Sequence, residues 1–419
     1  MHPLVKPALR RGWRDLNTVQ FGMTPAHALT LGPVDTATGS FLDLLDGTRG
    51  IGLLREEGHR MDLPDPQVDE LVERLEQAGL LDDATGGGAP GEALRARKDA
   101  FERLLPDLAS LSLTTSRPGE PVARLAARRA QRVQVRGAGR VGTQVAALLA
   151  AAGVGEVEVR DIGCVEPWDV TPGGLPAESV GERRTEAARR AVRRAAPDTP
   201  PRRRRPWPPG DGEPGLSLVI LTPRDDVSVH TPDPARAAPL IESGTPHLYA
   251  GVVEATGVVG PFVLPGATGC AGCLQHGRTD RDPVWPRLVA QWRTGRPRPV
   301  RACDLTLATT VAGLAAAHAL SFLAGDTPSS AGARWEVALP ALHWRARQVV
   351  PHPACRCGAS PEGRRQDAQR GVRTGAAHGE EEHTAEDGVP HERMAEQRPS
   401  PEGHRADAAR PTGTWRAHV

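Results

Sequence analysis

The residues best suited to chemistry are two pairs of cysteines. They read Cys270-Ala-Gly-Cys273 and Cys355-Arg-Cys357, and a turn-forming proline or glycine stands beside each pair. Two such pairs can supply four thiolates, which is the ligand set of a structural, tetrahedral zinc site. Isolated thiols without a metal are the alternative. We expect a structural zinc ion with no coordination position left for water, bound by Cys270, Cys273, Cys355 and Cys357.

A glycine-rich turn, Gly137-Ala-Gly139-Arg-Val-Gly142, is the second candidate site. The residues before it, 132–136, alternate as a strand does, and the Ala-rich run 143–152 after it resembles a buried helix. A second alternating run ends at Asp161, at about the 20-residue spacing of nucleotide-binding βαβ units. Glycines let the backbone approach a phosphate, and an acid can accept a ribose hydroxyl. The alternative is a nucleotide fold that has lost its nucleotide, with Asp161 as a turn residue.

Three further side chains could take part in chemistry. Cys303 precedes a long apolar run, Leu305–Leu323, whose helix-terminal amides could lower the pKa of the thiol. A partly buried thiol without chemistry is the alternative. Arg183 and Arg184 begin another predicted helix, where they could contact a phosphate or be solvated. Cys164 is expected to be a small buried residue.

The elements in residues 1–83 predict a small α+β domain. Two short strands are expected within Trp13–Thr30, a helix at Ala37–Leu45, an amphipathic helix at Val68–Ala78 and a small strand at Gly79–Asp83. Helices followed by a short β-wing favour a winged-helix-like domain. Residues 84–130 are expected to form a glycine-rich linker and a helical connection, with breaks at two prolines.

Residues 131–358 alternate strand and helix patterns. A largely apolar run, Leu216–Leu221, is typical of a central parallel strand. Helices are expected at 180–196, at 234–243 and from 305, and strands at 247–253, 257–264, 335–339 and 341–349. This pattern predicts an α/β domain, with a Rossmann-like, mostly parallel sheet and helices on both faces. Residues 359–419 lack Leu, Ile, Phe, Tyr and Cys, so we expect a disordered tail.

Composition limits the class of protein. The formal net charge is +1 over 419 residues, which argues against a nucleic-acid-binding surface. The longest apolar run is interrupted by Thr, Gly, His and Ser and favours a buried helix over a membrane span. The chain does not open on a signal-peptide pattern. We expect a cytoplasmic protein without a membrane partner.

The order of these motifs resembles the ThiF/MoeB/E1 family of ubiquitin-like activating proteins over roughly 130–358. The resemblance is carried by the glycine turn, Asp161, the two cysteine pairs, Cys303, Ala152-Gly-Val-Gly155 and Val180-Gly181 with Arg183-Arg184. Gly260-Pro-Phe-Val-Leu-Pro-Gly266 and Cys270-Ala-Gly-Cys-Leu-Gln-His276 look like actinobacterial ThiF-like proteins of peptide natural-product (RiPP, thiazole/oxazole) biosynthesis. Residues 1–83 are similar to the winged-helix peptide-recognition domain of such proteins, which holds a leader peptide as an added strand.

The resemblance implies a site and its partners. Active members use ATP and Mg²⁺ to adenylate a C-terminal carboxylate. It implies that Asp161 holds the ribose, that the turn holds the phosphates, that Arg184 replaces a family lysine, that Asp225 or Asp226 is the metal acid, and that Cys303 is catalytic; the turn residues are Gly137, Gly139, Arg140 and Gly142. The implied partners are a precursor peptide or ubiquitin-like carrier protein, a YcaO-type cyclodehydratase and a second copy in a homodimer.

Two segments depart from the family pattern. Asp169-Val-Thr-Pro-Gly-Gly174 lacks the expected Asn and Arg, and Thr222-Pro-Arg-Asp-Asp226 displaces the metal acid. Arg140 is a candidate either to replace the missing arginine or to fill the phosphate site. Three functions therefore stay open: an adenylating enzyme, a non-catalytic protein that presents a precursor peptide to a cyclodehydratase, and an NAD-dependent oxidoreductase. The last is the weakest, because nothing downstream resembles a hydride-transfer site.

Overall fold

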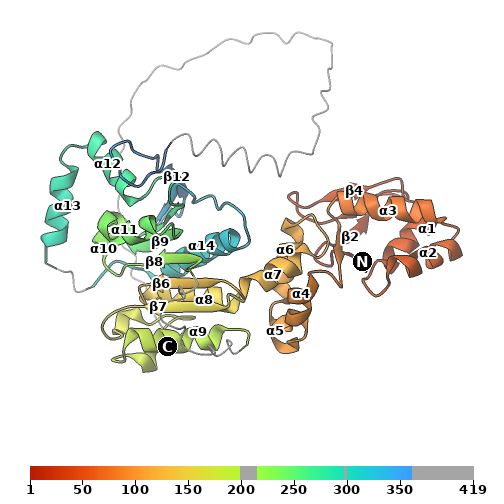
Figure 1. Cartoon of the computed structure of the whole chain (residues 1–419), viewed down its shortest axis with the longest axis horizontal. Helices are drawn as coiled ribbons and strands as arrows, with labels where there is room; N and C mark the ends of the chain where they lie inside the picture. Colours follow the sequence, from red (N-terminus) through yellow and green to blue (C-terminus); the bar gives the residue numbers. More distant parts are fainter. Residues whose placement is uncertain (199–214, 297–299, 361–419) are drawn as a thin grey trace, which may run out of the picture. The chain divides into compact units, whose positions relative to one another are not determined.

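The computed structural model describes residues 1–198, 215–296 and 300–360 (Figure 1). The predicted disordered tail from 361 onward lies outside the described residues.

Residues 1–83 fold around a core of their own. Their strands are β1 (Pro3–Val5), β2 (Arg11–Trp13), β3 (Val19–Phe21), β4 (Leu29–Leu31) and β5 (Leu81–Asp83). β1 pairs with β5, and β2, β3 and β4 form a separate antiparallel sheet with β3 in the centre. The helices are α1 (Thr36–Phe41), the 3-10 turn η1 (Leu42–Leu44), α2 (Ile51–Arg60) and α3 (Asp65–Gln77).

Two expectations for this region need correction. The segment predicted to hold two strands contributes to three, β2 to β4. The helix α2 was not predicted, because Gly52 and Gly58 give its sequence a low helix propensity. Gly58 has a packing role, since a Cβ there would lie 2.6 Å from Cγ2 of Val68. The glycine therefore allows α2 to approach α3 closely.

Residues 84–130 are mostly helical. The elements are α4 (Gly88–Arg95), α5 (Lys98–Arg103), α6 (Leu105–Thr114) and α7 (Glu120–Arg128). α4 begins inside the predicted glycine-rich linker, which is shorter than expected. Pro106 stands in the first turn of α6 and Pro118 lies just before α7, so both prolines mark the expected breaks.

A seven-stranded sheet with the order β12-β11-β10-β9-β8-β6-β7 organises the rest of the chain. The parallel strands are β6 (Arg132–Arg136), β7 (Glu156–Arg160), β8 (Leu218–Leu221) and β9 (His247–Val253). The antiparallel extension is β10 (Thr256–Val263), β11 (Ala333–Ala338) and β12 (Trp344–Gln348). Four parallel strands and an antiparallel edge confirm the predicted α/β class with a mostly parallel sheet.

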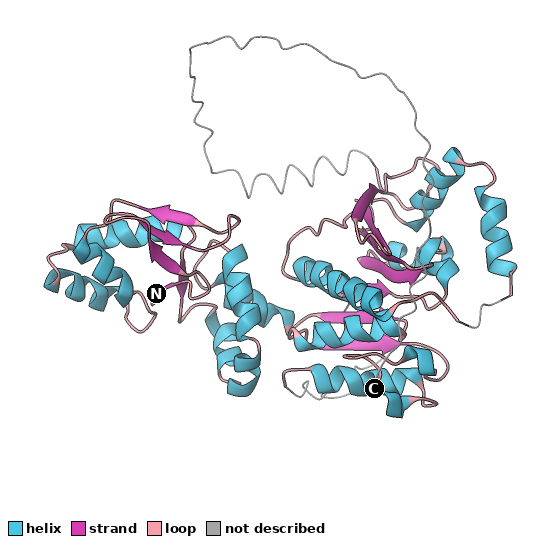
Figure 2. Ribbon diagram, turned by 180° about the vertical axis from the view of Figure 1, so that it is seen from behind, coloured by secondary structure: helices cyan, strands magenta, loops and turns pink. Residues whose placement is uncertain are grey.

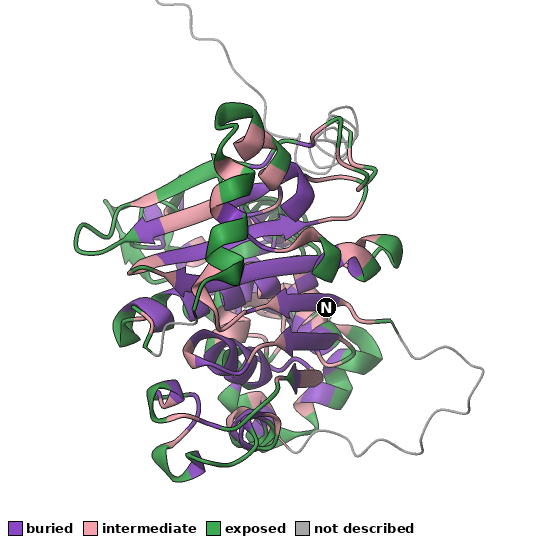
Figure 3. Ribbon diagram, turned by 90° about the vertical axis from the view of Figure 1, so that its left-hand side faces the viewer, coloured by how far each residue is buried: buried purple, intermediate pink, exposed green. Residues whose placement is uncertain are grey.

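Helices cover both faces of this sheet (Figure 2). One face packs against α8 (Arg140–Ala151), α9 (Arg184–Ala195) and α14 (Leu305–Leu323), around alternate strand residues such as Val133, Val135 and Ile220. The other face carries α10 (Asp226–His230), α11 (Pro234–Glu242), α12 (Ala271–Arg281) and α13 (Trp285–Thr294). Figure 3 shows the central strands largely buried between these layers.

The helix α14 is long and apolar enough, by composition, to cross a membrane. Its residues Ala308, Val311, Ala312 and Ala315 are instead buried in the core under the sheet. The packing agrees with the expected core helix.

Candidate functional site

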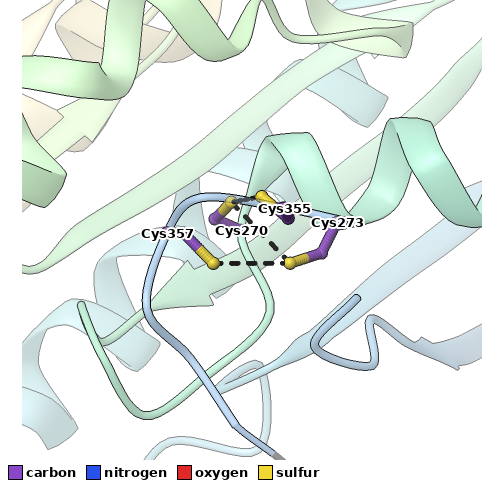
Figure 4. A group of neighbouring side chains, drawn as sticks. All are labelled: Cys270, Cys273, Cys355 and Cys357. Carbon is purple, nitrogen blue, oxygen red and sulfur yellow. Dashed lines mark hydrogen bonds between the residues drawn. The ribbon is translucent and has the colours of Figure 1, made fainter. Parts of the chain in front are cut away.

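The four cysteines predicted as metal ligands come together (Figure 4). Cys270 and Cys273 stand at the start of α12, whereas Cys355 and Cys357 lie in the loop after β12. The Sγ–Sγ distances are 3.9 Å for Cys270–Cys273, 3.6 Å for Cys270–Cys355 and 3.5 Å for Cys273–Cys357. Zinc–sulfur bonds of about 2.3 Å in a tetrahedron place the sulfurs about 3.8 Å apart. The cluster could therefore hold a metal ion of this kind.

The surroundings of the cluster suit a structural metal. The backbone amide of His352 donates to Sγ of Cys273 at 3.3 Å, a type of contact that orients and stabilises a metal-bound thiolate. The hydrogen bond between Cys270 and Cys273 lowers the pKa of Cys273 and raises the pKa of Cys270, so it favours the thiolate form at Cys273. Tyr249, Val263 and Val349 form a small core against the cysteines. The cluster joins α12 to the loop after the last strand of the sheet.

The glycine turn lies between β6 and α8, and its outer glycines have packing reasons of their own. Gly137 has a φ of +120°, and a Cβ there would lie 1.9 Å from the carbonyl oxygen of Thr222. A Cβ on Gly142 would lie 2.0 Å from the carbonyl oxygen of Gly137. Thr222 follows β8, and its Oγ1 donates to that same carbonyl at 3.0 Å. Both glycines are required by the fold whether or not a nucleotide binds.

Asp161 lies beside the turn, as its spacing predicts, but it bonds to the protein backbone. Its Oδ2 accepts from the amide of Ala138 at 2.5 Å, and its Oδ1 accepts from the amide of Ile162 at 2.6 Å. The side chain is only 7% exposed. The carboxylate therefore ties the end of β7 to the glycine turn.

Arg184 is buried at the start of α9 and is surrounded by acceptors. Its Nε donates to Asp169 at 2.9 Å, its Nη2 to Glu166 at 2.7 Å, and its Nη1 to the carbonyl of Ile162 at 2.7 Å. Asp161 lies 3.6 Å from the same guanidinium. Every nitrogen of this side chain has an acceptor within the protein, so Arg184 is held in a structural ion-pair group.

Arg224 completes the group from the loop after β8. Its Nη2 donates to Oδ1 of Asp169 at 2.8 Å and also to Glu166. The hydrogen bond from Arg224 lowers the pKa of Glu166, with Arg184 acting in the same direction. We call these five residues the acid–arginine cluster: Asp161, Glu166, Asp169, Arg184 and Arg224.

Two arginines cover the glycine turn. A Cβ placed on Gly139 would lie 3.1 Å from Cγ of Arg224, so the Arg224 side chain runs over the turn. Arg140 donates through Nε to the carbonyl of Trp168 at 2.6 Å and through Nη1 to the carbonyl of Cys303 at 2.8 Å. The remaining cavity, which Gly139, Arg224 and Cys303 help to line, has a volume of about 160 Å³. Typical small-molecule sites measure about 300–1,000 Å³.

Cys303 lines this cavity without an activating environment. Burial raises the pKa of its thiol, and the charge of Arg140 opposes that effect only in part. The N-terminus of α14 is capped by Asp304, whose carboxylate accepts from the amide of Leu307 at 3.0 Å. The helix-terminal amides thus have a partner within the chain. Cys164 is exposed, and the expectation that it is buried is wrong because it lies in the loop beyond β7.

Asp225 lies elsewhere. It is the N-cap of α10 and accepts from the amide of Ser228 at 2.7 Å. Asp225 and Asp226 line a second, larger cavity and not the one at the glycine turn. The structure therefore groups the turn, Asp161, Arg184 and Cys303 at one place and leaves Asp225 outside it.

The residues at the turn do not fit the ATP and Mg²⁺ that the resemblance implies. The side chain of Arg224 covers the backbone at Gly139, where a phosphate would have to approach. Both carboxylate oxygens of Asp161 accept hydrogen bonds from backbone amides. Asp169 is the carboxylate that lines the cavity, and it is already paired with Arg184 and Arg224. A free phosphate cradle and a free metal acid are both missing from the described residues at this turn. Sequence reasoning missed the roles of Glu166, Asp169 and Arg224, because no local pattern announces a long-range ion pair.

Comparisons with known proteins agree with the fold. The model of the ThiF family matches residues 119–359, more than half of the chain. A structure of E. coli MccB with AMPCPP and selenomethionine-labelled MccA has a TM-score of 0.62 and 15% identity, covering 86% of this chain and 100% of that one. A structure of selenomethionine-labelled PaaA has a TM-score of 0.58 and 17% identity, covering 82% of this chain and 99% of that one. A search of curated proteins finds no match. The chain belongs to the ThiF family.

Proposed function

We propose that this ThiF-family protein is a non-catalytic peptide-binding protein, which holds the leader of a precursor peptide and presents it to a modifying enzyme such as a YcaO-type cyclodehydratase. The acid–arginine cluster is the observation that carries the proposal. It occupies the place over the glycine turn where an adenylating enzyme needs room for phosphates and a positively charged clamp. The small volume left in this cavity, about 160 Å³, also argues against a bound dinucleotide. The metal-binding cysteines then stabilise the sheet domain as a scaffold.

Residues 1–83 supply the peptide site in this proposal, as a winged-helix-like module with an open sheet edge. In the β2–β3 pair, Gly22 donates to the carbonyl of Arg10 at 2.7 Å and Arg14 donates to the carbonyl of Thr18 at 2.8 Å. Hydrogen-bonded pairs alternate along an antiparallel ladder. The backbone groups of Arg11 therefore point away from β3.

The same alternation applies to the other outer strand, β4. Because Gln20 bonds toward β2, its neighbours on β3 bond toward β4, and Thr30 of β4 points outward. Neither the amide of Arg11 nor that of Thr30 has an acceptor among the described residues. An extended peptide can add to such an edge as a further strand, with main-chain hydrogen bonds supplying affinity. The likeness to MccB, of which a structure contains MccA, is compatible with a peptide partner.

Fluorescence polarisation of a labelled leader peptide from a candidate precursor tests the proposal. Thr30→Pro and Arg11→Pro each remove one outward amide and leave the internal ladder intact. We expect the full-length protein to bind the leader, and one of the two variants to lose at least tenfold in affinity. The other variant then serves as the matched control. No binding by the wild-type chain, or equal binding by all three proteins, would contradict the proposal.

Adenylation remains a second candidate, favoured by one observation. The β6–turn–α8–β7 layout with Asp161 beside the turn has the arrangement of a nucleotide-binding unit. An assay of ATP-dependent pyrophosphate exchange with the precursor peptide separates the two candidates, because only the enzyme supports exchange.

A further inference from the structure

The larger cavity lies on the opposite side of the sheet from α8 and α14. It measures about 810 Å³ and is lined by α10, α13 and the strands β9 to β11, together with the loops beside them. Its size falls within the range of ligand sites. We call it the Arg334 cavity; the residues used below are Asp226, His230, Glu254, Trp292, Arg334 and Glu336.

Arg334 is the unusual feature of this cavity, because it is an arginine only 1% exposed with one donor unused. Its Nε donates to Glu336 at 2.8 Å, and its Nη1 lies 3.3 Å from the carbonyl oxygens of Val229 and His230. Its Nη2 is buried and has no partner among the described residues. Leaving a buried donor unpaired is costly, more so on a charged group. The arrangement lacks one acceptor.

An aromatic wall stands beside Arg334. The ring of His230 lies 5.6 Å from Trp285 and 6.0 Å from Trp292, and the two indoles are 5.6 Å apart. Burial lowers the pKa of His230 to about 4, so the imidazole is neutral at pH 7. Trp292 lines the cavity and is 43% exposed, which leaves ring surface for a ligand. This wall offers apolar contact next to a cation.

The cavity is also lined by acidic side chains. Glu254 lines the cavity from the β9–β10 turn, where it has a φ of +47° and Ala255 a φ of +55°. Such hairpin turns favour Asn and Gly, and other residues held in this region are strained. Asp226 also lines the cavity. Arg236, Arg293, Arg296 and Arg301 line the same cavity, so its charge is mixed. The carboxylates can accept hydrogen bonds from peptide amides and the arginines can pair with a peptide carboxylate, so the lining suits a peptide.

We propose that the Arg334 cavity binds a carboxylate of a peptide, with Nη2 of Arg334 as the donor and Trp292 packing against the neighbouring residue. The carboxylate is a peptide C-terminus or an Asp or Glu side chain. The inference rests on the proposed function only in taking a peptide as the ligand, and it adds a second contact, apart from the leader site in residues 1–83.

Affinity selection with defined peptide libraries tests this inference on the full-length, zinc-loaded protein. Three N-acetylated hexapeptide libraries serve as probes: one with free C-termini and no Asp or Glu, one amidated with Asp and Glu, and one amidated without them. We expect the protein to retain peptides from the first or the second library and none from the third, as measured by mass spectrometry. Enrichment from the first library indicates a C-terminal carboxylate, and enrichment from the second indicates a side chain. Retention of all three alike, or of none, overturns the inference.

Variants assign the binding to this cavity. Arg334→Gln should reduce retention at least tenfold, as expected for the loss of one charge-assisted hydrogen bond. Because Arg334 is buried, Trp292→Ala provides a second variant at an exposed position, with an expected loss of several fold. Arg347→Gln is the matched control, since Arg347 is 71% exposed and also lies beside Glu336. Wild-type retention by both Arg334→Gln and Trp292→Ala would refute the assignment.

The outcomes also separate this inference from the leader-binding proposal. Thr30→Pro and Arg11→Pro should leave retention of the carboxylate libraries unchanged. Leader binding that fails while carboxylate binding persists would overturn the proposed function alone. The reverse result would overturn the Arg334 inference alone.

Discussion

Replacing Arg184 with methionine should destabilise the folded protein by about 3 kcal/mol. The side chain of Arg184 is 6% exposed, and its partners Asp169 and Asp161 are 4% and 7% exposed. Removing one partner of a buried ion pair costs about 3–5 kcal/mol, because an uncompensated charge remains. We expect the lower end of this range, since Arg224 still pairs with Asp169 and the third partner, Glu166, is 41% exposed. Methionine keeps an unbranched, apolar stem of similar length.

The assay is urea unfolding of the zinc-loaded, full-length chain, followed by far-UV circular dichroism. Arg183→Met is the matched control, because it makes the same change at the neighbouring, exposed position. A surface substitution of this kind shifts the free energy of unfolding by at most about 0.5 kcal/mol. The reasoning is refuted if Arg184→Met is as stable as Arg183→Met, because the acid–arginine cluster would then not be a structural unit.

Three further predictions concern other parts of the chain. Cys357→Ser should remove a bound zinc ion and lower the thermal unfolding midpoint, because structural zinc contributes folding free energy; unchanged zinc content by atomic emission spectroscopy would contradict the site. His247→Phe should flatten the dependence of stability on pH. Burial lowers the pKa of His247 from 6.5 to about 4, so the unfolded histidine takes up a proton first, and the wild-type chain loses about 3 kcal/mol as pH falls from about 6.5 to about 4. The free energy of unfolding is measured by urea titration at pH 7 and at pH 5. An equal fall between these two pH values in the wild-type chain and in His247→Phe would count against this cause. Ala255→Gly should raise the free energy of unfolding by about 1 kcal/mol, because it relieves a left-handed backbone at φ +55°; a destabilised variant in the same titration would show that the turn is not strained.

Local spacing made part of the structure predictable. The alternation in residues 132–136 and 156–160, with the glycine turn between them, specifies the β6–α8–β7 unit, because the strand and helix periods are short-range properties. The two cysteine pairs have the short spacings of metal ligands, so their meeting in one cluster could be predicted from the sequence.

The content of the site could not be predicted in the same way. Arg224 reaches Asp169 from a different loop, and nothing near either residue in the sequence signals the contact. The family resemblance implied Asp225 or Asp226 as the metal acid, but the hydrogen bond that Asp225 accepts from the amide of Ser228 makes it a helix cap. The unpaired donor of Arg334 depends on packing from α10 and β11 together. Such features are set by tertiary contacts and not by sequence pattern.

Pyrophosphate exchange by the whole zinc-loaded chain, measured with Mg²⁺-ATP and a precursor peptide, decides whether this protein adenylates a peptide. With the leader peptide shown to bind in the same preparation, we predict no ATP-dependent exchange above a protein-free control, because Arg224 lies over the glycine turn and pairs there with Asp169. Exchange that requires the peptide would contradict the account and identify the chain as an adenylating enzyme.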